Sequence, residues 1–259
     1  MGKRLIKTLI QSRYLFTQLV KRDFRQKYKK TTLGLLWSAL NPLCEFAIMM
    51  LIFRNLFGRD TPHYTIYLLS GVLIYSMFSS ATHGGMTAIL GNAGIITKIN
   101  VPKWFFVLSK NVACLVDFGI TFLILVIYMF IDQITFSWKF IFLLVPLACL
   151  LLFNFGMSMI LSTMYVFFKD TQYLYNIFCR LLNYLSAIFW QVTILPEPYR
   201  DLLKLNPLYN YILYFRNVII DGVIPPLTDN LICIGYAIGF FLAGCIVYKL
   251  NNKKFIYYL

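Results

Sequence analysis

The chain has 259 residues, of which 59% are hydrophobic, and it carries a formal net charge of +14 at pH 7. Its mean hydropathy is +0.70, whereas a soluble domain is nearer half apolar and half polar. This composition disfavours a soluble enzyme and a soluble nucleic-acid-binding protein, and it predicts a polytopic membrane protein without a nucleic-acid partner.

The first segment, residues 1–33, is predicted to be a cytoplasmic amphipathic helix at the membrane interface. Between residues 3 and 30, apolar side chains recur at roughly helical spacing and basic side chains fill the other face. Such a helix lies with its apolar side at the acyl boundary and its cations among the headgroups. Two roles fit this pattern: a membrane anchor alone, or a docking site for a cytoplasmic partner. The segment lacks the continuous apolar run of a cleavable signal peptide.

Gly34 and Pro42 mark the passage from this helix into the membrane. Glycine permits a sharp turn, and proline removes one backbone donor near the start of the following helix. Trp37 is expected at headgroup level. A flat basic helix that leads into a crossing helix would suit a lever that receives force from the cytoplasm.

Six apolar blocks predict an all-α integral membrane domain over residues 34–251. Each block approaches or exceeds the ~20 residues that a helix needs to cross a bilayer. The third and fourth are long enough to require tilting. The predicted spans are residues 34–57, 64–82, 104–131, 140–168, 174–195 and 231–250.

Lysine and arginine set the predicted orientation. Most of the 24 basic residues fall on one side when both termini are placed in the cytoplasm. Cytoplasmic loops carry this excess in membrane proteins. The positive charge therefore reflects topology and attraction to anionic membrane lipids, and it does not require a polyanionic substrate.

Three polar side chains fall inside predicted spans: Glu45, Asp117 and Asn154. A charged group at membrane depth costs ~2.5–3.5 kcal/mol or more and usually faces a cavity or a partner. These residues either line a hydrophilic pathway or form neutral, hydrogen-bonded packing contacts. Gly235 and Gly239 form a GxxxG pattern, which allows close helix packing.

Residues 196–230 are predicted to form a re-entrant segment on the outer side. The apolar run at 208–220 is too short to cross and is interrupted by polar residues. Two short helices are expected, the second starting at Pro207. The tyrosines of this segment fit an interfacial belt or a sugar-stacking exit. The residues singled out in the segment are Asn206, Pro207, Tyr211 and Arg216.

Several chemical signatures are missing from the sequence. It contains no P-loop motif for ATP. His63 and His83 fall at opposite ends of the second predicted span, and the six cysteines form no CxxC pair. No catalytic, cofactor-binding or metal-binding residue is therefore assigned, and a membrane-embedded enzyme is the weaker class.

Four stretches carry a resemblance to a known family: RDFRQKYKKTTLGLLWSALNPL at 22–43, NAGIITKINVPKW at 92–104, FKD at 168–170, and NPLYNYILYFRN at 206–217. With them the chain resembles the transmembrane permease subunit of ABC exporters of lipid-linked polysaccharides. That family, with an ABC type-2 transmembrane domain, includes the O-antigen, capsule and wall teichoic acid export permeases.

The resemblance implies a homodimer with two copies of a separate ABC ATPase, which would bind the ATP and magnesium. The permease pair would pass a lipid-linked glycan across the cytoplasmic membrane. The residues implied in ATPase coupling are Arg25, Lys27, Tyr28, Lys98, Asn100, Pro102 and Asp170. Aromatic residues suited to a glycan path, or equally to packing and lipid contact, are Phe46, Tyr75, Phe78, Tyr184, Phe189 and Trp190.

Other functions are compatible with the same residues. An ion-coupled secondary transporter or lipid flippase would use Glu45 or Asp117 as the titrating group. A drug or small-lipid exporter would share the ABC fold, and an integral membrane transferase would act without an ATPase.

Overall fold

The computed structural model describes residues 13–28, 34–57, 62–98 and 101–258. All regular structure in these ranges is helical, which confirms the all-α class. The elements are α2 (Arg13–Tyr28), η1 (Gly34–Leu36), α3 (Trp37–Phe57), α4 (Tyr64–Ala88), η2 (Leu90–Asn92), α5 (Ala93–Ile96), α6 (Trp104–Ile131), η3 (Trp138–Leu143), α7 (Leu144–Phe167), α8 (Thr171–Leu185), η4 (Val192–Ile194), α9 (Glu197–Leu203), α10 (Pro207–Ile219), α11 (Leu227–Asn251) and α12 (Phe255–Tyr258).

Four helical stretches of the described chain are long and apolar enough to cross a membrane: α4, α6, η3 with α7, and α11. The third predicted span coincides with α6, whereas the second continues to Ala88 and the sixth begins at Leu227. The first and fifth predicted spans correspond to α3 and α8. Since α8 has only 15 residues, six crossings stay a prediction.

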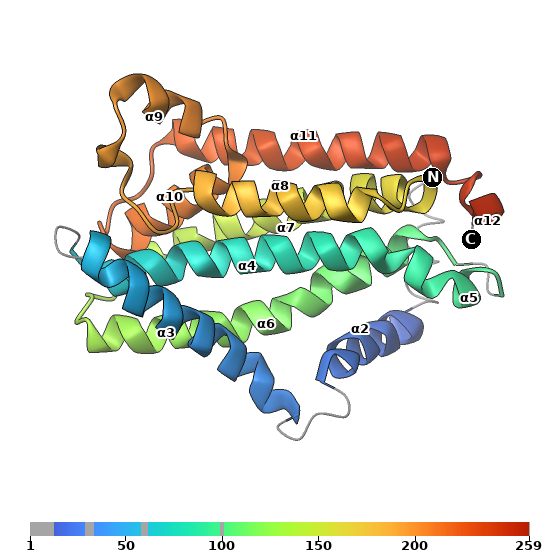
Figure 1. Ribbon diagram of the computed structural model, residues 1–259, viewed down its shortest axis with the longest axis horizontal. Coiled ribbons are helices and arrows are strands. Elements are labelled where there is room, and N and C mark those ends of the chain that lie inside the picture. Colours follow the sequence, from blue (N-terminus) through green and yellow to red (C-terminus); the bar gives the residue numbers. More distant parts are fainter. Residues whose placement is uncertain (1–12, 29–33, 58–61, 99–100, 259) are drawn as a thin grey trace.

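The long helices form a bundle whose ends are chemically different (Figure 1). Helices α4, α6, α7 and α11 run along the long axis, with α7 packed on α11 and α4, and α4 packed on α6. Helix α3 crosses α4 and α6 obliquely. The elements predicted to be cytoplasmic, α2, α5 and α12, gather at one end, and α9 lies at the other. This is the separation that the charge-based orientation requires.

The closest helix crossing joins α7 to α11 through two glycines. A Cβ atom on Gly156 would overlap the backbone of Phe240, and one on Gly244 would overlap the Gly156 carbonyl oxygen. By contrast, a Cβ on Gly235 or Gly239 would meet no described atom within 4 Å. The GxxxG pattern therefore makes no close crossing within the described part of this chain.

The turn into the first membrane helix has the predicted geometry at Gly34. Its φ angle is 51°, in the left-handed region that favours glycine. Pro42 lies inside α3, as the sequence indicates. The apolar face of α2 packs on α6, where the rings of Phe16 and Phe105 meet edge to face at 5.0 Å and Leu19 is buried. This face is thus covered by protein, at least in part, and not by lipid alone.

Candidate functional site

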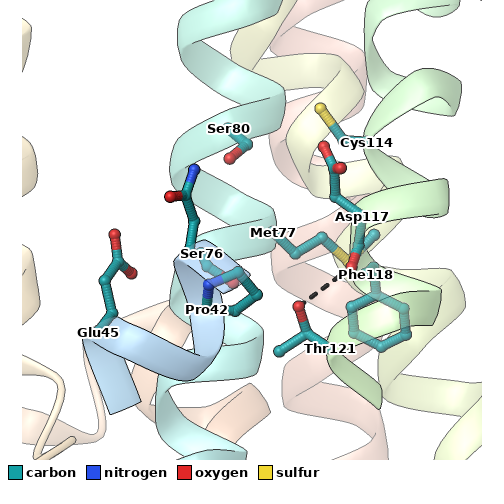
Figure 2. A pocket seen from close by; sticks show the side chains of 10 residues that line it. Pro42, Glu45, Ser76, Met77, Ser80, Cys114, Asp117, Phe118 and Thr121 are labelled. Carbon is teal, nitrogen blue, oxygen red and sulfur yellow. Dashed lines mark hydrogen bonds between the residues drawn. The ribbon is translucent and has the colours of Figure 1, made fainter. Parts of the chain in front are cut away.

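A polar cleft with a volume of 160 Å³ lies between α3, α4 and α6 (Figure 2). Helix α3 contributes one wall, α6 the facing wall, and the serines of α4 lie between them. The polar residues that line the cleft are Asn41, Glu45, Ser76, Ser80, Asp117 and Thr121. The structure therefore brings the two predicted intramembrane carboxyl groups, Glu45 and Asp117, to a single site.

Helical spacing explains why these side chains meet. Residues four apart lie on the same face of a helix, and the cleft receives one such pair from each wall, for example Ser76 with Ser80 on α4. Thr121 donates a hydrogen bond to the carbonyl of Asp117 at 3.1 Å, and Ser76 donates to the Leu73 carbonyl at 3.0 Å. The hydroxyl groups thereby satisfy their protons locally, while their oxygens remain available as acceptors.

Asn154, the third predicted intramembrane polar residue, is not part of this cleft. It is completely buried on α7, and neither atom of its amide group has a hydrogen-bond partner among the described residues. A buried amide without partners costs about 1–3 kcal/mol. It neither lines the cleft nor makes the hydrogen-bonded packing contact that was the other prediction.

The predicted outer segment consists of two short helices, α9 and α10, as expected. Pro207 occupies the first turn of α10, and the Asn206 side chain caps the helix by accepting the Leu208 N–H at 3.0 Å. Tyr211 is buried, and its hydroxyl donates to the Cys233 carbonyl of α11 at 3.1 Å. This tyrosine therefore ties α10 to α11 instead of lying in an interfacial belt or a sugar exit.

The fifth predicted span is broken. Helix α8 ends at Leu185, and Ala187 has a φ angle of 50°. Carbonyl groups freed at such a break need donors at membrane depth. The donors are Tyr64 to Phe189 at 2.8 Å, Tyr67 to Trp190 at 2.8 Å, and Arg216 to Ala187 and Ile188 at 2.9 and 3.2 Å.

The predicted docking residues lie at the opposite end of the bundle. Arg25, Lys27 and Tyr28 belong to the last turns of α2, but their side chains fall outside the described part, as does all of Asn100. Lys98 and Asp170 are exposed, and Pro102 is half-buried. Exposure leaves these described groups accessible to a cytoplasmic partner.

Lys103, which the sequence did not single out, joins this end to the C-terminal region. Its Nζ atom donates to the Asn252 carbonyl at 2.6 Å and lies 5.2 Å from the ring centre of Phe255. Burial lowers the pKa of the Lys103 ammonium. The predicted docking loop is therefore anchored to the chain that follows α11.

Most of the aromatic residues predicted for a glycan path are packed inside the bundle. Phe46, Phe78 and Phe189 are buried, and Tyr75 is hydrogen-bonded to the Cys179 carbonyl at 2.7 Å. The exceptions are listed here with their settings: Tyr184 is 63% exposed, and Trp190 lines an apolar cavity of 610 Å³ at the end of α8. Their part in a path stays a prediction.

Sequence reasoning missed four polar residues of the cleft, Asn41, Ser76, Ser80 and Thr121. A signal for them exists. Each lies four residues from another cleft residue, inside an otherwise apolar block. A search for polar pairs at this spacing would have selected the same helix faces.

Comparison with known proteins places the chain among membrane transport proteins. Residues 14–220 match the family model for "ABC-2 type transporter". The chain is 30% identical to the O-antigen export system permease protein RfbA of Klebsiella pneumoniae over 82% of this chain and 83% of the relative. It is 25% identical to RfbA of Myxococcus xanthus over 97% and 98%, and 23% identical to the polysialic acid transport protein KpsM of Escherichia coli over 78% and 80%.

Proposed function

Because the chain belongs to the ABC-2 type transporter family, we propose that it is the permease subunit of an ATP-driven transporter that exports a cell-surface polysaccharide across the cytoplasmic membrane. The observation that carries this proposal is similarity to an O-antigen export permease along 97% of the chain. The protein is accordingly a multi-pass membrane transport subunit and not an enzyme.

The proposal assigns ATP hydrolysis to a separate ABC ATPase, since the sequence has no P-loop motif. Two copies of that ATPase would act on two copies of this chain. A bundle of this size is too small to enclose a polymer, and a second copy would supply the other wall of a channel. Helices α3 and α8 expose large apolar side chains, such as Leu51 and Leu174, that a second copy or lipid would cover.

The ATPase is proposed to dock on the end of the bundle that carries α2 and α5. This surface has the exposed cation of Lys98 and the exposed carboxylate of Asp170, together with the basic residues at the end of α2. Charged, exposed groups of both signs suit a protein partner at an interface rim. ATP binding would thereby press on α2 and on the segment that follows α4.

The polar cleft is proposed to accept sugar residues of a lipid-linked glycan. Sugar hydroxyls can donate to the carboxyl groups of Glu45 and Asp117 and to the oxygens of Ser76 and Ser80. A volume of 160 Å³ limits the cleft to about one sugar ring in this conformation. The substrate need not be ionised, because the cleft has acidic and hydroxyl groups in its wall and would repel a phosphate.

Gene deletion tests the proposed function directly. Cells that lack this chain, or the ABC ATPase encoded beside it, should accumulate glycan on the cytoplasmic face and lose it from the surface. Surface glycan is measured by gel electrophoresis of whole-cell extracts with immunoblotting. Undiminished surface polysaccharide in either deletion strain contradicts the proposal.

The ion-coupled alternative has one observation in its favour, the meeting of Glu45 and Asp117 in one cleft. The double variant Glu45→Gln/Asp117→Asn preserves shape and hydrogen bonding but cannot titrate. The ATP-driven proposal expects export within about twofold of the native level, whereas ion coupling requires its abolition. Ser76→Leu and Ser80→Leu should instead block the cleft and lower export about tenfold, if the glycan passes there.

A further inference from the structure

Helix α2 carries a buried acidic residue that the amphipathic pattern does not explain. The Asp23 side chain is only 2% exposed, although α2 is otherwise rich in exposed basic groups. A carboxylate in such a position is stabilised only where cations and donors surround it, because desolvation of an isolated charge is costly. The partners of Asp23 therefore show what α2 is built to hold.

Two cations converge on this carboxylate. Lys110 of α6 lies 3.1 Å from the Asp23 Oδ1 atom, and Arg22 Nη2 lies 2.8 Å from the same oxygen. The hydroxyl of Ser109 also donates to Asp23 Oδ2, at 3.4 Å. Lys110 and Ser109 both belong to α6, so the ion pair fixes α2 to the cytoplasmic half of that helix.

Arg22 extends the connection to a third element. The same Nη2 atom donates to the side-chain oxygen of Asn92 at 2.8 Å. Asn92 ends η2 and is buried, and its own amide nitrogen donates to the Ala88 carbonyl at the end of α4, at 2.7 Å. A continuous set of hydrogen bonds thus joins α2, the end of α4, and the start of the segment that contains α5 and Lys98.

We propose that Arg22, Asp23, Asn92 and Lys110, the α2 anchor, are positioning residues that make the two cytoplasmic docking elements move as one body. The inference rests on the proposed function, in which an ATPase presses on α2 and on the segment after α4. With the α2 anchor intact, force applied to either element reaches both α4 and α6. Without it, α2 yields against α6, and ATP is hydrolysed with less export.

The experiment uses the full chain with its ATPase in proteoliposomes and measures glycan exported per ATP hydrolysed. Arg22→Gln removes the bridge to Asn92 and is expected to lower this ratio about five- to tenfold, with ATPase co-purification unchanged. Lys21→Gln is the matched control: it removes one positive charge from the neighbouring exposed residue. Its ratio should stay within about twofold of the native one.

Asn92→Ala cuts the same bridge from the other side without altering the charge of α2. It should reproduce the Arg22→Gln loss, and the double variant should be no worse than either single variant. Equal effects of Arg22→Gln and Lys21→Gln, or normal coupling in Asn92→Ala, would overturn the inference. A native complex without any ATP-dependent export would refute the proposed function itself, before the anchor is tested.

Discussion

Replacing Arg216 should destabilise the outer half of the molecule more than any other loss of a single arginine in the described chain. Arg216 is 4% exposed, and its hydrogen-bond partners in the described part are all backbone carbonyls. They come from α4 and from the broken end of α8. The guanidinium also lies 3.4 Å from the ring centre of Tyr67. Arg216 thus joins three elements with one group.

The magnitude follows from the carbonyls that Arg216→Met would leave without a donor. The Ile188 carbonyl would lose its 3.2 Å bond, and the Ala187 carbonyl would keep only a 3.3 Å bond from the Tyr67 hydroxyl. Each buried group left unsatisfied costs about 1–3 kcal/mol, and the lost cation–π contact adds about 1 kcal/mol. The expected cost is therefore about 3–6 kcal/mol. At about 2–4 °C per kcal/mol, the unfolding midpoint should fall by about 10 °C or more.

The assay is thermal unfolding of the purified chain in detergent, followed by intrinsic fluorescence. Arg200→Met is the matched control. Arg200 also donates to two carbonyls, at 2.7 and 2.8 Å, but its site is partly exposed, so water can replace the lost bonds. Its midpoint should change by less than about 3 °C. Equal midpoints for the two variants would refute the argument that Arg216 serves the broken end of α8.

Two further predictions concern helix packing and coupling. Gly156→Val and Gly244→Val should prevent α7 from packing on α11 and abolish accumulation of folded protein, whereas Gly239→Ala, which meets no described atom, should be tolerated; size-exclusion chromatography of the purified chain separates these outcomes. Reversing the charge of Arg25 and Lys27 together should lower export while preserving membrane insertion, as measured by surface glycan and by membrane fractionation; normal export would count against docking at this end of α2.

Most of the membrane helices could be predicted from hydropathy, because a long apolar run has few alternatives in a bilayer. The α6 prediction matches its helix at both ends. The fifth span failed because its sequence remains apolar beyond Leu185 while the backbone turns. That turn depends on donors from Tyr64, Tyr67 and Arg216, which lie far away in sequence. A local pattern carries no information on such distant donors.

The candidate site was predictable in part for a similar reason. A carboxyl group in an apolar block is conspicuous, so Glu45 and Asp117 were found, but their meeting depends on how α3 crosses α4 and α6. Asp23 shows the opposite case. On a helix with many cations, one acidic residue resembles a surface ion pair, and only tertiary packing against Lys110 shows that it is buried.

The position of the α2 anchor changes how force would travel through this chain. The sequence favoured a lever in which α2 acts on α3, the next helix along the chain. In the structure, the apolar face of α2 and the Asp23 ion pair are both held by α6. Helix α6 forms one wall of the polar cleft, and α3 forms the other. Movement of α2 would therefore shift the Asp117 wall relative to the Glu45 wall, so that the docking surface controls the width of the cleft through α6.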